Sequence, residues 1–281
     1  WIQPLSLEAG PPSPSPPVPL PPPFTADIPV ALATAGVLVD RPMTLDIRWG
    51  DQRLALPVRI VGAYPVRRLP AAGGNPFSSG QAEAIAALPA ITLDRQSDVV
   101  EFAFDPGITP WRGPQDLSAT ARIAHDGRGL YFHFNVTDNK HVQASTPSRL
   151  DRGDSVQIAI AGTGEHAGHV TTLSLGLTDK GEQAIWCTRS TGLASAGRQD
   201  TPLRITRTGN LTRYEAWVPF DILGITCPPD ATGALPLRFS FIVNEDDGQR
   251  PDRWQRRVRY LRWKNGLANE ASRLGHATLQ P

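Results

Sequence analysis

The sequence predicts an all-β protein: an antiparallel β-sandwich of jelly-roll type, preceded by a small β unit and an extended proline-rich arm. Three observations support this prediction. After Pro89, short segments alternate apolar and polar residues, and turns rich in Gly, Asp or Pro separate them. Only residues 81–88 and the Asp221-Ile-Leu-Gly turn have helical character. Prolines dominate residues 10–23.

The chain divides into four parts. Residues 1–23 form the arm, because proline fixes φ and removes backbone donors; the arm is either a tether to something upstream or an ordered segment lying along a partner protein. Residues 24–70 form the small β unit, with alternating segments at 28–32, 43–49 and 53–61 and a turn at Gly50-Asp51. Residues 71–89 form a linker, and residues 90–281 form the sandwich.

Eleven sandwich strands follow from the alternation of apolar and polar residues. We expect them at 98–104, 118–125, 129–137, 154–161, 169–177, 182–188, 202–207, 212–219, 235–244, 255–263 and 273–279. This spacing of short strands and turns is typical of sandwiches and jelly rolls.

Composition excludes two classes of partner. A net charge of +1 over 281 residues provides no concentrated basic surface for nucleic acid. No apolar run approaches the roughly 20 residues that span a bilayer, so we expect no transmembrane segment. The chain starts at Trp1, and it is either a processed mature form or a fragment of something longer.

Neither the cysteines nor any catalytic motif indicates a specific chemistry. Cys187 and Cys227 form either one disulfide or two separate buried thiols. The sequence has no nucleophile elbow, P-loop, dinucleotide fingerprint or set of zinc ligands, so we expect a protein that is not an enzyme. Haem is not expected either. Related haem-binding domains hold the iron with a Met and a His, and the only methionine here, Met43, lies outside the sandwich. Ligation by two histidines is the haem alternative that stays open.

Six motifs follow one another through the second half of the chain. They are Trp111-Arg-Gly-Pro-Gln-Asp-Leu-Ser-Ala119, Asp126 to Asp138, Gly153-Asp-Ser-Val-Gln157, Tyr214-Glu-Ala-Trp-Val-Pro-Phe220, Phe239-Ser-Phe-Ile-Val-Asn-Glu-Asp-Asp-Gly248, and Trp263-Lys-Asn-Gly-Leu267 before Leu274-Gly275. In this order they resemble the family-9 carbohydrate-binding modules of the DOMON-like sandwich superfamily. The resemblance covers about residues 90–280.

That resemblance implies a sugar site. In the family an aromatic pair clamps a sugar ring, while carboxylates, amides and an Arg bind its hydroxyls. Trp263 falls on one clamp position, and the other is occupied here by Asp151. The remaining half-clamp either binds sugar weakly, borrows Trp186, Tyr131 or Trp254 as the second aromatic, or marks a lost sugar site. The polar ligand-binding residues expected are Asp151, Asn244, Glu245, Asp247 and Arg250. Structural calcium in some members implies a cation at Asp138 and Asp154.

Two functions remain open. The first is a non-catalytic carbohydrate-binding module of an extracytoplasmic protein, periplasmic or secreted, that binds an oligosaccharide or polysaccharide. The alternative is a scaffold subunit of an envelope or membrane-associated complex. It would have kept the sandwich, lost the sugar site, and contacted a partner protein through the proline-rich arm and the small β unit.

Overall fold

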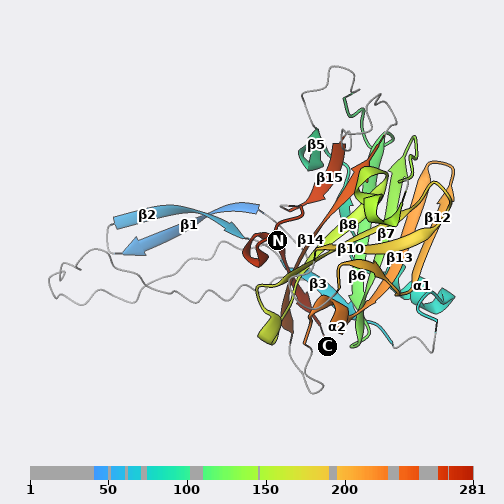
Figure 1. Ribbon diagram of the computed structural model, residues 1–281. Coiled ribbons are helices and arrows are strands. Elements are labelled where there is room, and N and C mark those ends of the chain that lie inside the picture. Colours follow the sequence, from blue (N-terminus) through green and yellow to red (C-terminus); the bar gives the residue numbers. More distant parts are fainter. Residues whose placement is uncertain are drawn as a thin grey trace. The chain divides into compact units, whose positions relative to one another are not determined.

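The computed structural model describes residues 41–49, 52–60, 63–70, 75–101, 110–144, 146–189, 195–226, 234–246, 259–264 and 266–280 (Figure 1). The chain separates into two units, residues 1–63 and residues 64–281. The proline-rich arm, the expected strand at 28–32 and the Gly50-Asp51 turn lie outside the described residues.

The described part of the first unit is a two-stranded antiparallel sheet. Strand β1 (Arg41–Trp49) pairs along its whole length with β2 (Gln52–Ile60). Both strands were expected from the alternating sequence.

The second unit contains the sandwich, and its first layer is built around β14 (Figure 1). In order the strands are β11 (Gly197–Gln199), β10 (Gln183–Arg189), β9 (Val170–Leu177), β8 (Ser155–Ala161) and β14 (Leu235–Glu245). The free side of β14 pairs with β16 (Gly275–Leu279) along its first half and with β15 (Arg259–Trp263) along its second half. Strand β5 (Val99–Glu101) then pairs with β15.

The second layer is antiparallel except at one strand. Strands β4 (Ile91–Leu93), β6 (Leu117–His125), β7 (Gly129–Asp138), β13 (Leu211–Pro219) and β12 (Leu203–Thr208) follow one another. Strand β3 (Tyr64–Arg68) runs parallel to both β16 and β6 and so links the two layers. The sequence had placed these five residues in the small β unit, but they belong to the sandwich.

The core lies between the layers. Phe134 on β7 meets Phe241 on β14 edge-to-face at 5.1 Å, and Tyr64 on β3 meets Phe239 at 6.0 Å. Strands β8 and β9 are buried on both faces, whereas β6 alternates buried and half-buried residues. The outer face of the first layer is therefore covered over its central strands.

Helices are few and short. Helix α1 (Ser79–Ala86) begins at an N-cap provided by Ser78, and it packs Ile85 against Tyr131 on the outer face of the second layer. Helix α2 (Phe220–Leu223) ends at Gly224 in the left-handed conformation that glycine accepts without strain. Four 3₁₀ segments complete the set: η1 (Gln96–Asp98), η2 (Pro147–Arg152), η3 (Gly164–His166) and η4 (Ala271–Arg273). Within the described residues no helix is long and apolar enough to cross a membrane.

Candidate functional site

A row of side chains crosses the outer face of the first layer. The pairing registers align Trp186 on β10, Ser174 on β9, Gln157 on β8, Ile242 on β14 and Arg262 on β15. Side chains alternate between the two faces along a strand, so the residues directly before and after each member of the row point into the core. The row spans four inter-strand spacings of about 4.8 Å, about 19 Å in all.

Amide and hydroxyl groups form a network at the centre of this face. Gln157 donates from Nε2 to Ser174 Oγ at 2.9 Å, and its Oε1 accepts from Asn244 Nδ2 at 3.1 Å. Asn244 Nδ2 also donates to Ser155 Oγ at 2.9 Å. All four residues are buried. Each amide is thus held in one orientation by its neighbours, and the network makes a rigid polar floor.

The two ends of the row differ from its centre. Trp186 is half-buried and packs against Ala144, Leu150 and Ala184, while Arg262 is exposed. Tyr260, which pairs with Asn244, is half-buried beside Arg262. An aromatic face and a guanidinium are groups that bind the C–H faces and hydroxyls of sugars, and the buried amide network holds the strands between them in place.

Two segments border this face. At one end η2 and its flanking loop lie on it, with Leu150 buried against Ala184 and beside Gly176. At the other end the segment after β15 packs Ala268 and Leu274 against Ala159. Asp151 lies half-buried in η2, on the bordering loop and not in the row.

Trp263 does not lie on this face. Its ring stacks on Phe239 at 4.6 Å and on Phe241 at 5.8 Å, both of which belong to the core. The alternation along β15 explains this, because Leu261 points inward and Trp263 is two residues further on. The expectation that Trp263 stacks on a sugar is therefore replaced by a packing role.

Glu245 is also turned inward. Its Oε2 lies 2.7 Å from Arg259 Nε, and Arg259 Nη1 lies 2.6 Å from Asp116 Oδ2, with all three side chains buried. A carboxylate committed to a buried ion pair is not available to a sugar hydroxyl. Of the polar residues implied by the resemblance, Asn244 reaches the row and Glu245 does not.

Several expected residues cannot be placed. Asp247, Arg250 and Trp254 lie outside the described residues, as does Cys227. Cys187 is a buried free thiol whose Sγ lies 3.4 Å from the carbonyl oxygen of Arg189, and the disulfide gains no support from this. Tyr131 is buried beneath α1 on the other layer, so it cannot serve as the second aromatic.

Asp138 and Asp154 are brought together, as the expected cation site requires. Asp138 ends β7, Asp154 precedes β8, and a ligand atom of each lies within 4.8 Å of the other and of one from His141. Burial and then the nearby Asp154 raise the pKa of Asp138 to about 8. Burial raises the pKa of Asp154 to about 7.

The donor set does not fit calcium. Calcium takes six to eight oxygen ligands, and here an imidazole is the third group. Backbone N–H groups already occupy the carboxyl oxygens: Lys140 donates to Asp138 Oδ1 at 2.9 Å, and Val142 and Asp246 donate to the two oxygens of Asp154. The calcium expectation is therefore not carried further.

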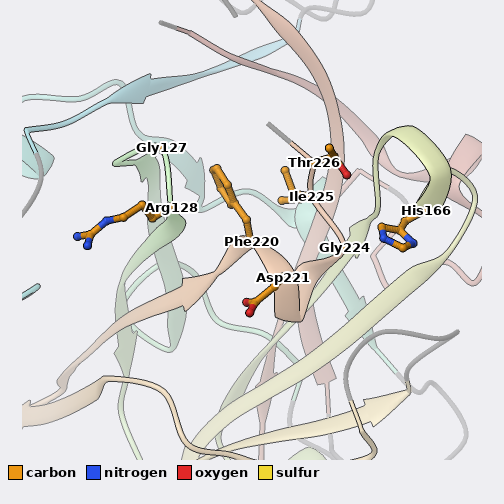
Figure 2. Close-up of a pocket in the computed structure, with 8 residues that line it drawn as sticks. All are labelled: Gly127, Arg128, His166, Phe220, Asp221, Gly224, Ile225 and Thr226. Atoms are coloured by element: carbon orange, nitrogen blue, oxygen red, sulfur yellow. The ribbon is translucent and has the colours of Figure 1, made fainter. Parts of the chain in front are cut away.

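A cavity of about 430 Å³ lies where the β6–β7 turn, η3 and α2 meet, lined by Gly127, Arg128, His166, Phe220, Asp221, Gly224, Ile225 and Thr226 (Figure 2). Figure 2 shows the Arg128 side chain pointing away from the other lining residues. Its guanidinium pairs with Asp126 at 3.2 Å. Since its polar groups do not converge, this cavity is a weaker candidate than the outer-face row.

Sequence reasoning did not assign Gln157, Ser174 or Arg262 to the site, and it named Trp186 only as a substitute aromatic. A usable signal was present for Gln157: Val156 and Ile158 flank it and mark the inward positions of β8. The same signal marks Ser174, because Leu173 and Leu175 flank it and mark the inward positions of β9.

Comparison with solved structures supports the fold. The chain is similar to a putative carbohydrate-binding protein from Bacteroides uniformis, with 11% identity and a TM-score of 0.50 over 78% of this chain and 100% of that one. It is also similar to a family-9 carbohydrate-binding module from Caldicellulosiruptor kristjanssonii in complex with cellotriose, with 18% identity and a TM-score of 0.49 over 78% of this chain and 93% of that one. The same source provides a family-9 module in complex with glucose, with 15% identity and a TM-score of 0.46 over 77% and 95%.

The domain shares the fold of the Bacteroides uniformis protein, and at 11% identity the likeness concerns the fold alone. No family model matches the sequence, and neither does any curated protein. What the module binds must therefore be argued from its own residues.

Proposed function

We propose that the sandwich is a non-catalytic carbohydrate-binding module whose saccharide contacts the two ends of the outer-face row that retain solvent exposure, Trp186 and Arg262. The observation that carries this proposal is the placement of Trp186, Gln157 and Arg262 on one cross-strand row, with Asn244 hydrogen-bonded to Gln157. Trp186 supplies the aromatic stacking surface, in place of Trp263.

The contacts to ligand come from the ends of the row. Trp186 and Arg262 retain solvent exposure, whereas the Gln157–Asn244 amides are buried and form the floor. About 19 Å separates the two end strands, which is longer than one sugar ring. We therefore infer a preference for oligosaccharides and polysaccharides over monosaccharides. The module would work in an extracytoplasmic protein, where such polymers occur.

The test is calorimetric titration of the full chain with glucose, cellotriose and a panel of plant and bacterial polysaccharides. Trp186→Ala should weaken oligosaccharide binding by about tenfold or more, which corresponds to about 1.4 kcal/mol. The matched control is Trp217→Ala, because Trp217 is also half-buried on an outer face but packs against the α1 cluster of the other layer. Circular dichroism checks that both variants fold.

Two results would overturn the proposal. Absence of binding by the wild-type chain across the whole panel would remove the carbohydrate function. Equal binding by Trp186→Ala and the wild type would remove the outer-face site. The scaffold alternative depends on the proline-rich arm, which lies outside the described residues.

A further inference from the structure

Strand β10 has a β-bulge just after Trp186. Its pairing with β9 is regular as far as Cys187, and then Thr188 is passed over, so that Arg189 pairs with Thr172. In a regular strand Arg189 would point inward like Cys187, because side chains alternate between the two faces. The extra residue instead turns Arg189 onto the outer face, which also carries Trp186.

The contact that Arg189 makes agrees with this orientation. Its Nη1 donates to Oδ1 of Asn269, in the segment that packs Ala268 and Leu274 against the outer face. The Arg189 side chain remains exposed, and within the described residues it forms no ion pair. Because the asparagine amide has no net charge, this hydrogen bond leaves the positive charge of the guanidinium uncompensated.

A second guanidinium lies beside Trp186 on the neighbouring strand. Arg198 on β11 is the direct antiparallel partner of Trp186. Directly opposite residues share a face, with Cβ atoms about 4.5–5.5 Å apart. Arg198 pairs with Glu182, but the two side chains are 54% and 41% exposed. An ion pair this exposed is weak, so a carboxylate from a ligand can take the place of Glu182.

The positions next to Trp186 on the outer face are therefore unequal in charge. They are Ala184 and Arg189 along β10, Ser174 on β9 and Arg198 on β11. Two of these side chains are guanidiniums and none is a carboxylate. An indole bordered by two cations matches a ring that carries a negative charge at its edge.

Charged groups further from the indole do not reverse this balance. The cations are Arg149 and Arg152 on η2, whose Leu150 belongs to the cluster that Trp186 contacts. The described acids at a similar remove are Asp151, Glu182 and Asp200. Glu182 is already paired with Arg198, so two arginines face two acids in this outer set.

We propose that the Trp186 position binds an anionic sugar ring, which stacks on the indole while its acidic group lies between Arg189 and Arg198. A guanidinium presents paired N–H donors that match the oxygens of a carboxylate or of a sulfate ester, so uronates and sulfated sugars share the chemistry required. This inference rests on the saccharide-binding function proposed above and adds the class of saccharide and two residues that determine it.

The test is calorimetric titration of the full chain with cellotriose, its 6-sulfate and the matching β-1,4-linked triglucuronate, and with trigalacturonate and its neutral galactose counterpart. A charged oligosaccharide should bind about tenfold more tightly than its neutral partner at low salt, because two exposed charge pairs each contribute a few-fold. The advantage should shrink at about 0.5 M sodium chloride. Whether the sulfate or a uronate gains more identifies the acidic group.

Two outcomes of this titration would overturn the inference. Equal affinity within every matched pair would remove the charge preference and leave the saccharide-binding proposal standing. Failure of all five oligosaccharides to bind would also remove it, and the polysaccharide panel described above would then decide the function separately. A single-stranded oligonucleotide that bound as tightly as the charged sugars would indicate attraction to any polyanion and would overturn it too.

Variants locate the charge preference. Arg189→Gln and Arg198→Gln should each remove about threefold or more of the preference for the charged oligosaccharide. Glu182→Gln should tighten its binding, because Arg198 loses a competing carboxylate. The matched control is Arg213→Gln, since Arg213 is also exposed and also bonds an asparagine, Asn135 at 3.3 Å, but on the other layer.

The control and the aromatic variant give the decisive comparisons. Arg213→Gln should leave the charge preference unchanged, and a loss equal to that of Arg189→Gln would show that overall charge, and not the bulge, attracts the ligand. Trp186→Ala should weaken charged and neutral oligosaccharides alike. Charged-sugar binding that survives Trp186→Ala unchanged would place the anion away from the indole and refute the inference. Circular dichroism checks that each variant folds.

Discussion

The buried ion pairs of Arg259 provide the sharpest test of the structure. This guanidinium is fully buried and lies 2.7 Å from Glu245 and 2.6 Å from Asp116, whose side chain is 3% exposed. Arg259→Met keeps a long apolar side chain in place and removes the positive charge. The two carboxylates then remain in the core without the cation that faces both.

The expected loss of stability follows from the burial of the two acids. Removing one partner of a buried pair costs about 3–5 kcal/mol, because the uncompensated charge stays in a medium of low dielectric. Asp116 keeps its ion pair with Arg112 at 3.4 Å, so a loss within this range, about 3–5 kcal/mol, is expected. Since typical domains are stable by about 5–15 kcal/mol, this change removes a large share of the stability.

The assay is urea unfolding followed by tryptophan fluorescence, with Arg198→Met as the control. Arg198 pairs with Glu182, and their side chains are 54% and 41% exposed, so its removal should cost no more than about 1 kcal/mol. A loss for Arg259→Met no larger than that for Arg198→Met would refute the reasoning.

Three further outcomes are expected. Leu150→Ala, which empties a buried position on the loop beside the row, should lower the free energy of unfolding by about 2–5 kcal/mol in urea titrations. The free energy of unfolding should fall as pH rises from about 4 to about 8. The pKa values of Asp138 and Asp154 are raised in the folded state, so the folded state binds more protons than the unfolded state in this pH range. Unchanged stability in denaturant titrations across this range would contradict the prediction. Gln183→Ala should cost about 1–3 kcal/mol, because the Gln183 amide bonds both backbone groups of Ile205, and faster exchange of the Ile205 amide would report the loss.

Most sandwich strands were readable from the alternation of apolar and polar residues, whereas the three-residue strands β4 and β11 were not among those expected. The strand expected at 212–219 is observed at 211–219, and that expected at 182–188 is observed at 183–189. The position of Tyr64–Arg68 was not readable, because a five-residue strand looks the same in a small hairpin unit and in a sandwich. Its parallel pairing with β16 and β6 joins residues far apart in sequence, and no local pattern records that.

The candidate site was predicted less well because a motif does not state which face its residues occupy. Asn244 and Glu245 are neighbours, yet one lies on the outer network and the other in a buried ion pair. The alternation of side chains along the strand could have separated them. Phe239, Phe241 and Val243 mark the odd-numbered positions of β14 as inward, so Glu245 also points inward and Asn244 points outward. A motif match alone therefore does not distinguish a ligand-binding residue from a buried neighbour on the same strand.

The aspartate pair depends on contacts that the alternation of side chains along a strand does not record. The structure brings Asp138 at the end of β7 close to Asp154 before β8. Whether such a pair can hold a cation depends on which of its oxygens backbone N–H groups already occupy. Those donors come from Val142 within the loop and from Asp246 directly after β14. The donation from Asp246 exists only once β14 lies beside β8, so the tertiary structure decides whether the carboxyl oxygens are available to a metal.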